Sequence, residues 1–122
     1  MGIQKISDDV LLVDLPSTGS KIAEELKNVN EMVSDKCTCH VIIDFFRAEL
    51  LNSWNISNLL ALRSLLEDSG YQLILCNVKI VTKCIFTVAG LRKAFIFAGN
   101  KKAALAALQS SNSPSGAYSA SQ

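Results

Sequence analysis

Residues 41–66 read VIIDFFRAELLNSWNISNLLALRSLL, and this stretch decides the fold of the 122-residue chain. Together with His40, its first residues up to Phe45 form a continuous apolar, β-branched run, which is typical of a central strand covered on both faces. A helical stripe follows and ends at Ser69-Gly70; it consists of Ile56, Leu59, Leu60, Leu62, Leu65 and Leu66. The stretch therefore predicts a buried strand, a loop and an amphipathic helix, with Asn52-Ser53 where the helix begins.

The rest of the chain repeats this alternation. The predicted strands are residues 3–7, 10–15, 40–45, 73–76 and 94–98, and the predicted helices follow Ser20, Ser53, Val78 and Asn100. Ser20 is placed to cap the first helix. The apolar face of that helix is Ile22, Leu26, Val29 and Val33. Alternating strands and helices predict an α/β fold with a central sheet of four or five strands and about four helices packed against it.

Residues 79–89, KIVTKCIFTVA, give conflicting local signals. Their β-branched residues favour a strand by propensity. Four apolar residues nevertheless recur at the spacing of one helix face: Val81, Cys84, Ile85 and Val88. We therefore predict a helix packed against the sheet, with these residues on its apolar face.

Length and composition exclude several classes of protein. The length predicts one domain with a proper core. The formal net charge is +1, with Lys and Arg scattered, which gives no electrostatic case for nucleic-acid binding. A signal-peptide pattern is absent and the longest apolar run is broken by Arg92-Lys93, so we expect a cytoplasmic protein with no membrane insertion. We assign residues 1–109 to the domain. Residues 110–122, SSNSPSGAYSASQ, lack the apolar content to order themselves and are assigned to a flexible low-complexity tail.

Candidate chemistry is limited to a few side chains. Cys37, Cys39 and His40 in KCTCH could bind zinc, but a structural zinc site needs four ligands and no second pair exists. His40 is predicted to be a solvated strand-end residue, and Cys76 and Cys84 are predicted to be buried small hydrophobes. Because no phosphate loop, nucleophile elbow or Cys-x-x-Cys occurs, we expect no metal, no cofactor, no catalytic residues and no enzyme activity. The alternative to a protein without enzyme activity is a small enzyme or redox protein that uses Cys37 and Cys39.

From Val41 to Leu108 the chain resembles the STAS domains of bacterial anti-sigma factor antagonists. That family has an apolar strand ending in Asp, a loop, and Asp-Ser-[Ser/Thr/Ala]-Gly opening a leucine-rich helix. The matching pieces here are VIIDF, LLNSWN and ISNLLALRSLLEDSG. The later pieces SGYQLILCNV, TVAGLRKAFIF and KKAALAAL follow in the family's order. The resemblance implies a STAS-type fold with a mixed central sheet.

The resemblance also implies a function in transcription regulation. In the family, the serine after the aspartate is phosphorylated by a partner kinase that is also the anti-sigma factor, and phosphorylation ends the binding. This implies a regulatory module that binds an anti-sigma factor/serine kinase of GHKL type, with Ser53 as the phosphoacceptor. The implied partner-binding residues are Asn52, Ser53, Trp54, Asn55 and Ser57. Asn52 here replaces the family's aspartate, and Trp54 and Asn55 replace a small residue and glycine.

Two residues and the function itself keep alternative interpretations. Ser53 is either the phosphoacceptor or a plain helix N-cap, a role shared with Asn52. Trp54 is either a lid on the core or an exposed anchor for a partner; composition favours the lid, because exposed tryptophan is uncommon. The alternative function is a non-phosphorylated accessory or ligand-sensing STAS module, such as the cytosolic subunit of a lipid-transport complex.

Overall fold

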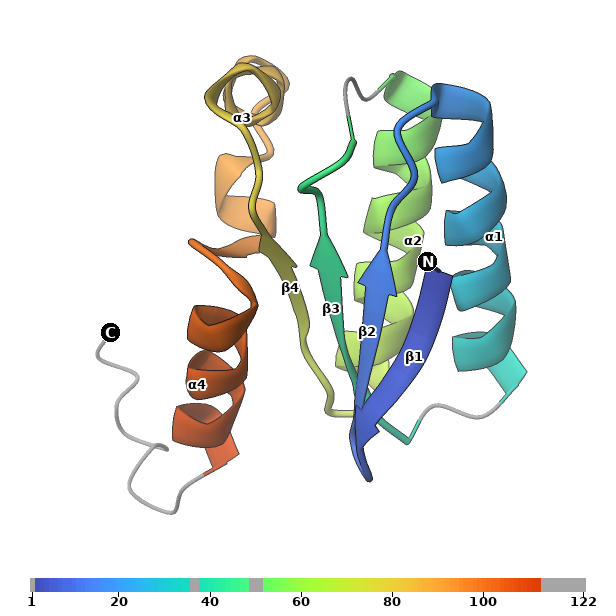
Figure 1. The fold of residues 1–122 in the computed structure, drawn as a ribbon, viewed down its shortest axis with the longest axis vertical. Helices are drawn as coiled ribbons and strands as arrows, with labels where there is room; N and C mark the ends of the chain where they lie inside the picture. Colours follow the sequence, from blue (N-terminus) through green and yellow to red (C-terminus); the bar gives the residue numbers. More distant parts are fainter. Residues whose placement is uncertain (1, 36–37, 49–51, 113–122) are drawn as a thin grey trace.

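The computed structural model describes residues 2–35, 38–48 and 52–112, which form a five-stranded sheet flanked by helices (Figure 1). The strands are β1 (Gly2–Ser7), β2 (Val10–Asp14), β3 (His40–Asp44), β4 (Leu73–Cys76) and β5 (Ile96–Ala98). They lie in the sheet in chain order. The β1–β2 pair is antiparallel and the other pairs are parallel. The predicted α/β fold with a mixed sheet is confirmed.

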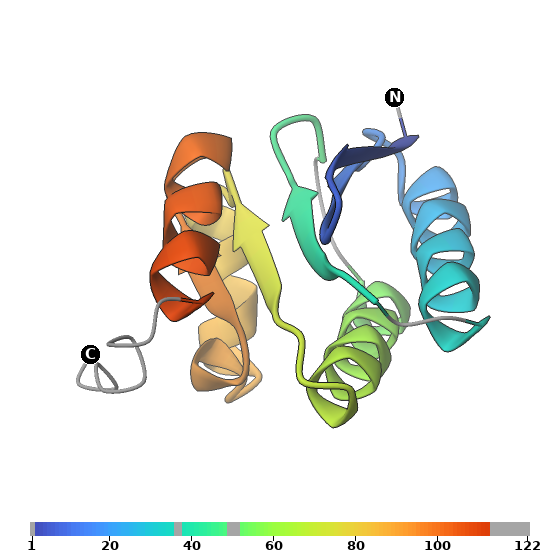
Figure 2. The same ribbon diagram turned by 90° about the horizontal axis from the view of Figure 1, so that it is seen from below.

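Helices provide the crossovers that the parallel strands need, and one further helix follows β5. They are α1 (Gly19–Asp35), α2 (Ser53–Asp68), α3 (Ile80–Val88) and α4 (Lys101–Asn112), with a short 3₁₀ helix η1 (Arg92–Ala94) after α3. Residues of α1, α2 and α3 share one core cluster, whereas α4 contributes to a second. Figure 2 shows α2 and α4 on opposite sides of the sheet. The molecule therefore has three layers, with α4 alone on one face.

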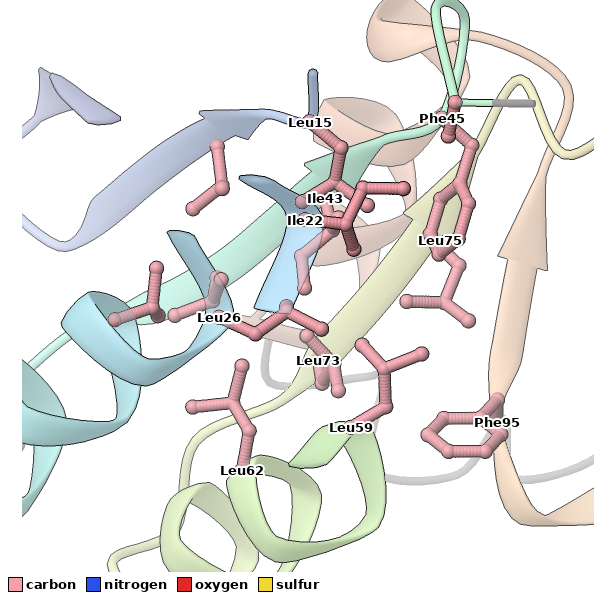
Figure 3. Packing of buried hydrophobic residues seen from close by; sticks show 14 of the residues in the cluster. Leu15, Ile22, Leu26, Ile43, Phe45, Leu59, Leu62, Leu73, Leu75 and Phe95 are labelled. Carbon is pink, nitrogen blue, oxygen red and sulfur yellow. The ribbon is translucent and has the colours of Figure 1, made fainter. Parts of the chain in front are cut away.

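The buried strand β3 divides its side chains between the two layers. Val41 and Ile43 belong to the core cluster beneath α1 and α2, and Ile42 to the cluster beneath α4. Side chains alternate along a strand, so a strand covered on both faces needs apolar residues at every position. Figure 3 shows Leu59 and Leu62 among the side chains that fill the larger cluster. The prediction of a strand covered on both faces is confirmed.

Two helix starts test the predicted caps. Helix α1 begins at Gly19, so Ser20 lies inside its first turn, and the Ile22 amide donates to the Thr18 carbonyl at 2.9 Å. The prediction of Ser20 as the cap is wrong, because the helix already begins at Gly19 and the residue before it is Thr18. The predicted start of a helix after Asn100 is confirmed, and Asn100 also caps it, since its Oδ1 accepts from the Ala103 amide at 2.8 Å. Helix α4 continues to Asn112, and residues 113–122 of the predicted tail lie outside the described residues.

Helix α3 forms where the spacing predicts it, but it buries a different face. Its buried residues are Thr82 and Phe86. Val81 is 62% exposed and Val88 is 88% exposed, and Cys84 is also exposed. The Phe86 ring makes edge contacts with the rings of Phe95 and Phe97, at centroid distances of 5.3 and 5.6 Å. The largest side chain thus takes the core position, and the predicted burial of Cys84 is wrong.

His40 is buried and not solvated as predicted. Its Nδ1 accepts a hydrogen bond from the Gln72 amide at 3.0 Å, and its ring meets Tyr71 edge-on at 5.0 Å. Burial lowers the pKa of the imidazole. Because Nδ1 accepts, this nitrogen carries no proton, and His40 acts as a structural link between β3 and the start of β4.

Candidate functional site

The loop between β3 and α2 carries the predicted site residues and is held by the residues after β4. Asp44 Oδ1 accepts from the Phe46 amide at 2.8 Å and from Asn77 Nδ2 at 2.9 Å. Asn77 has a φ of 57°, a left-handed conformation that asparagine tolerates better than most residues. Lys79 Nζ donates to the Ala48 carbonyl at 3.3 Å. Residues 49–51 lie outside the described residues, but the loop on their amino side is fixed at both Asp44 and Ala48.

Asn52, and not Ser53, caps helix α2. Its backbone is extended, with φ −111° and ψ 174°, and its Oδ1 accepts from the Asn55 amide at 2.8 Å. This is the geometry of a side-chain N-cap. Ser53 is the first residue of the helix and is exposed. The capping role therefore belongs to Asn52, and the helix start does not depend on the Ser53 hydroxyl.

Two large aromatic side chains flank the loop on the surface. Trp54 is 68% exposed and Phe46 is 70% exposed. The prediction that Trp54 covers the core is wrong, because the first turn of α2 directs Asn55 and Ile56 inward instead. Asn52 and Ser57 are also exposed. Exposed aromatic residues of this size are enriched in the parts of interfaces that contribute most to binding.

Asn55 differs from the other predicted site residues because it is fully buried. Within the described part of the chain, neither its Oδ1 nor its Nδ2 has a hydrogen-bond partner. Such an unpaired buried amide typically costs about 1–3 kcal/mol. Asn55 occupies the position of the family's glycine, and its contribution to the site is the backbone amide that Asn52 binds.

The carboxyl edge of the sheet also forms a hollow that the sequence reasoning missed. Its volume is about 710 Å³, and it is lined by Asp14, Leu15, Pro16, Ser17, Lys21, Asp44, Phe46, Arg47 and Lys101. Asp14 and Asp44 are register neighbours, and Lys101 Nζ lies 4.0 and 3.8 Å from their carboxylates. The signal was present in the sequence, since both VLLVD and VIID end in aspartate. Ligands of α/β sheets bind at such edges.

Two of the cysteines lie in contrasting surroundings, since Cys76 is buried and Cys84 is exposed. Burial, with a further contribution from Asp44, raises the pKa of Cys76 to about 12, so this thiol stays protonated. Cys37 lies outside the described residues. Among residues 2–35, 38–48 and 52–112, no group of three His, Cys, Asp or Glu side chains could hold a metal ion. No helix within these ranges has the length and apolar content to cross a membrane.

Comparison with known proteins gives no match to any family model. It gives no match among curated proteins either. Solved structures do match. An anti-sigma-factor antagonist (STAS) domain protein from Planctomyces limnophilus superposes with a TM-score of 0.76 at 17% identity, covering 89% of this chain and 99% of the other. This chain has the STAS fold.

Two further STAS-like structures extend this result. An RsbS variant from Moorella thermoacetica matches with a TM-score of 0.75 at 20% identity, covering 88% of this chain and 92% of the other. The Bacillus cell fate determinant SpoIIAA in its phosphorylated form matches with a TM-score of 0.65 at 16% identity, covering 83% and 93%. At these identities the likeness concerns the fold, and the expectation of a STAS-type sheet and helices is confirmed.

Proposed function

We propose that this STAS-fold chain is a regulatory protein-binding module that binds an anti-sigma factor/serine kinase of GHKL type. The binding surface is the exposed start of α2 with Asn52, Ser53, Trp54 and Ser57, together with Phe46 of the preceding loop. One observation carries the proposal: Asn52 caps the helix, so the exposed Ser53 hydroxyl can be modified without removing the cap. The similarity to anti-sigma factor antagonists supports the class of partner.

Phosphorylation of Ser53 acts on the surface and not on the fold. The kinase partner transfers the γ-phosphoryl group of a bound nucleoside triphosphate to Ser53 Oγ, which loses its proton. The product carries about −1.5 to −2 charges at the first turn of α2. A helix amino terminus favours negative charge, so α2 remains folded. An interface closed over the same position must desolvate that charge, and the partner therefore dissociates.

Trp54 is the anchor of this surface. A side chain that is 68% exposed in the free protein has most of its apolar area available for burial by a partner. Truncation of such anchors in interfaces typically costs about 2 kcal/mol or more, which is roughly thirtyfold in affinity. Asn55 is buried and supports the helix start from within.

The test compares three variants in binding to purified GHKL-type kinases of the same organism. Ser53→Asp should weaken binding at least tenfold, and Ser53→Ala should keep it. Ser64→Asp is the matched control, because Ser64 is also exposed on α2 but lies about three turns away. Incubation of the native protein with the kinase and ATP should place phosphate on Ser53, as detected by mass spectrometry. Equal affinity of Ser53→Asp and Ser53→Ala would refute the switch.

The hollow at the carboxyl edge favours a second candidate function, a ligand-sensing accessory module. Lys101 lies near both aspartates, whereas Lys21 and Arg47 line the hollow and, within the described residues, form no ion pair with either carboxylate. Lys21 and Arg47 are suited to bind a small anion. Calorimetric titration with inorganic phosphate tests this: the native protein should bind it and Arg47→Ala should lose at least tenfold in affinity. Absence of heat in the native protein would remove this candidate.

A further inference from the structure

Helix α3 turns its most apolar side toward solvent. Ile80 is 80% exposed, Val81 62% and Val88 88%, and Cys84 is exposed between them. With 3.6 residues per turn, these four positions fall within about 100° of the helix circumference. No polar residue of α3 lies inside that sector. We refer to Ile80, Val81, Cys84 and Val88 as the α3 face.

The opposite side of α3 is the one that attaches it to the sheet. Phe86 is fully buried against Phe95 and Phe97, and Thr82 is buried beside it. The helix cannot rotate to bury the α3 face without removing Phe86 from the core. Clustered exposed aliphatic side chains mark an interaction surface more often than isolated ones do.

The part of the sequence that contains the α3 face carries charge of a single sign. Residues 69–122 contain six Lys and Arg and no Asp or Glu, whereas residues 1–68 contain six basic and eleven acidic residues. Because strand order follows chain order, β4, α3, β5 and α4 form one end of the molecule (Figure 1). Lys79 and Lys83 lie on or next to α3, and Arg92 and Lys93 follow it in η1. A cover that also reaches the exposed Arg92 and Lys93 is favoured by negative charge.

The composition of the face distinguishes between possible covers. A second copy packed α3 against α3 would bring these cations together with no carboxylate from residues 69–122 to neutralise them. Protein partners are usually anchored by aromatic residues and arginine, and on this molecule the exposed tryptophan is at the α2 site instead. Aliphatic side chains rimmed by lysine and arginine fit a lipid surface, where apolar burial and attraction to anionic headgroups act together.

We propose that the α3 face docks the protein on the surface of an anionic lipid bilayer. Ile80, Val81 and Val88 enter the headgroup layer, and the exposed Arg92 and Lys93 of η1 lie over the lipid phosphates. A face supplied by a helix of nine residues gives weak, reversible and salt-sensitive binding. The chain remains at the surface, in keeping with the absence of a membrane-crossing helix from its described residues.

Vesicle co-sedimentation tests the proposal. The full chain should bind vesicles of phosphatidylcholine mixed with phosphatidylglycerol at least tenfold more tightly than vesicles of phosphatidylcholine alone. The double variant Ile80→Ser/Val88→Ser and the double variant Arg92→Gln/Lys93→Gln should each weaken binding to the mixed vesicles at least tenfold. Met32→Ser on α1 is the matched control, because Met32 is 46% exposed at the acidic end and should not affect binding. Thermal melting verifies that all variants are folded.

Three results would overturn the proposal. The first is equal binding to neutral and mixed vesicles, or none to either. The second is unchanged vesicle binding by Ile80→Ser/Val88→Ser. The third is self-association of the native protein in sedimentation velocity that this variant abolishes while neither protein binds vesicles, which would assign the face to contact between copies. Vesicle binding is measured without a kinase, so its failure leaves the proposed role of Ser53 unaffected.

Discussion

Helices α2 and α3 follow neighbouring strands and pack on the same face of the sheet, yet they use their apolar residues in opposite ways. Helix α2 buries most of the stripe that its spacing predicts, namely Ile56, Leu59, Leu62 and Leu66, and the other two members, Leu60 and Leu65, are partly buried. Helix α3 buries Thr82 and Phe86 and exposes most of its predicted face. Helix α2 also has α1 beside it, as the hydrogen bond from Asn30 Nδ2 to the Asn58 carbonyl shows. The contrast teaches that apolar spacing identifies a helix, whereas neighbouring side chains decide which face it buries.

The largest effect should come from Phe86, the main attachment of α3. Phe86→Ala removes a fully buried ring and its contacts with Phe95 and Phe97. Such truncations cost about 3–5 kcal/mol. Hydrogen exchange of the α3 amides should rise more than that of the α2 amides. Uniform protection of both helices in this variant would mean that α3 is held by other contacts.

A similar truncation in α2 should act globally. Leu62 is fully buried in the core cluster shared by α1, α2 and α3, so Leu62→Ala should lower the free energy of unfolding by about 2–5 kcal/mol. Denaturant titration should show a lower midpoint, with exchange of α1, α2 and β3 amides accelerated together. A loss under about 1 kcal/mol would contradict the picture of α2 as a core helix.

The starts of the two helices should differ by a smaller amount. Asn52→Ala removes the side-chain cap of α2 and should cost about 1 kcal/mol. Ser53→Ala should cost less, because Ser53 is not the cap. Helix α3 begins after Lys79, which makes no side-chain cap. Paired denaturant titrations of the two α2 variants decide this, and a larger loss for Ser53→Ala than for Asn52→Ala would reverse the assignment of the cap.

The smallest effect should come from the α3 face. Val88 is 88% exposed, so Val88→Ser should change the free energy of unfolding by less than about 0.5 kcal/mol. Leu66→Ser on α2 is the contrasting variant, since Leu66 is fully buried and its replacement places an unpaired hydroxyl in the core. A large loss for Val88→Ser would show that the α3 face packs against part of the chain.

Apolar patterning predicted the elements of this fold but not the surroundings of individual side chains. The run from His40 to Phe45 and the spacing of Leu59, Leu62 and Leu66 carry strong periodic signals, and both predictions are confirmed. The burial of Phe86 depends on Phe95 and Phe97, which lie beyond the helix in the chain and meet it only in the folded sheet. Local spacing holds no information about such contacts.

The candidate site was predictable in position and less so in detail. The sequence placed Asn52, Ser53 and Trp54 at the start of a helix, and the structure places them there. The sequence did not decide whether Asn52 or Ser53 caps the helix, because both residue types suit that position and only the backbone geometry distinguishes them. The exposure of Trp54 was mispredicted, since Ile56 fills the core position that the indole was expected to cover.

The order of the strands has a consequence for how the chain folds during synthesis. Each strand from β2 to β5 pairs with the one made immediately before it, so each has a partner as soon as it is translated. The β1–β2 hairpin can form first, and each later helix and strand unit can add to an existing edge. Pairing between chain neighbours keeps sequence separations short, which favours rapid folding for a sheet that is mostly parallel. Within the described residues α4 closes the second face, so Val10, Leu12 and Ile42 remain uncovered on that side until residues 101–112 have been translated.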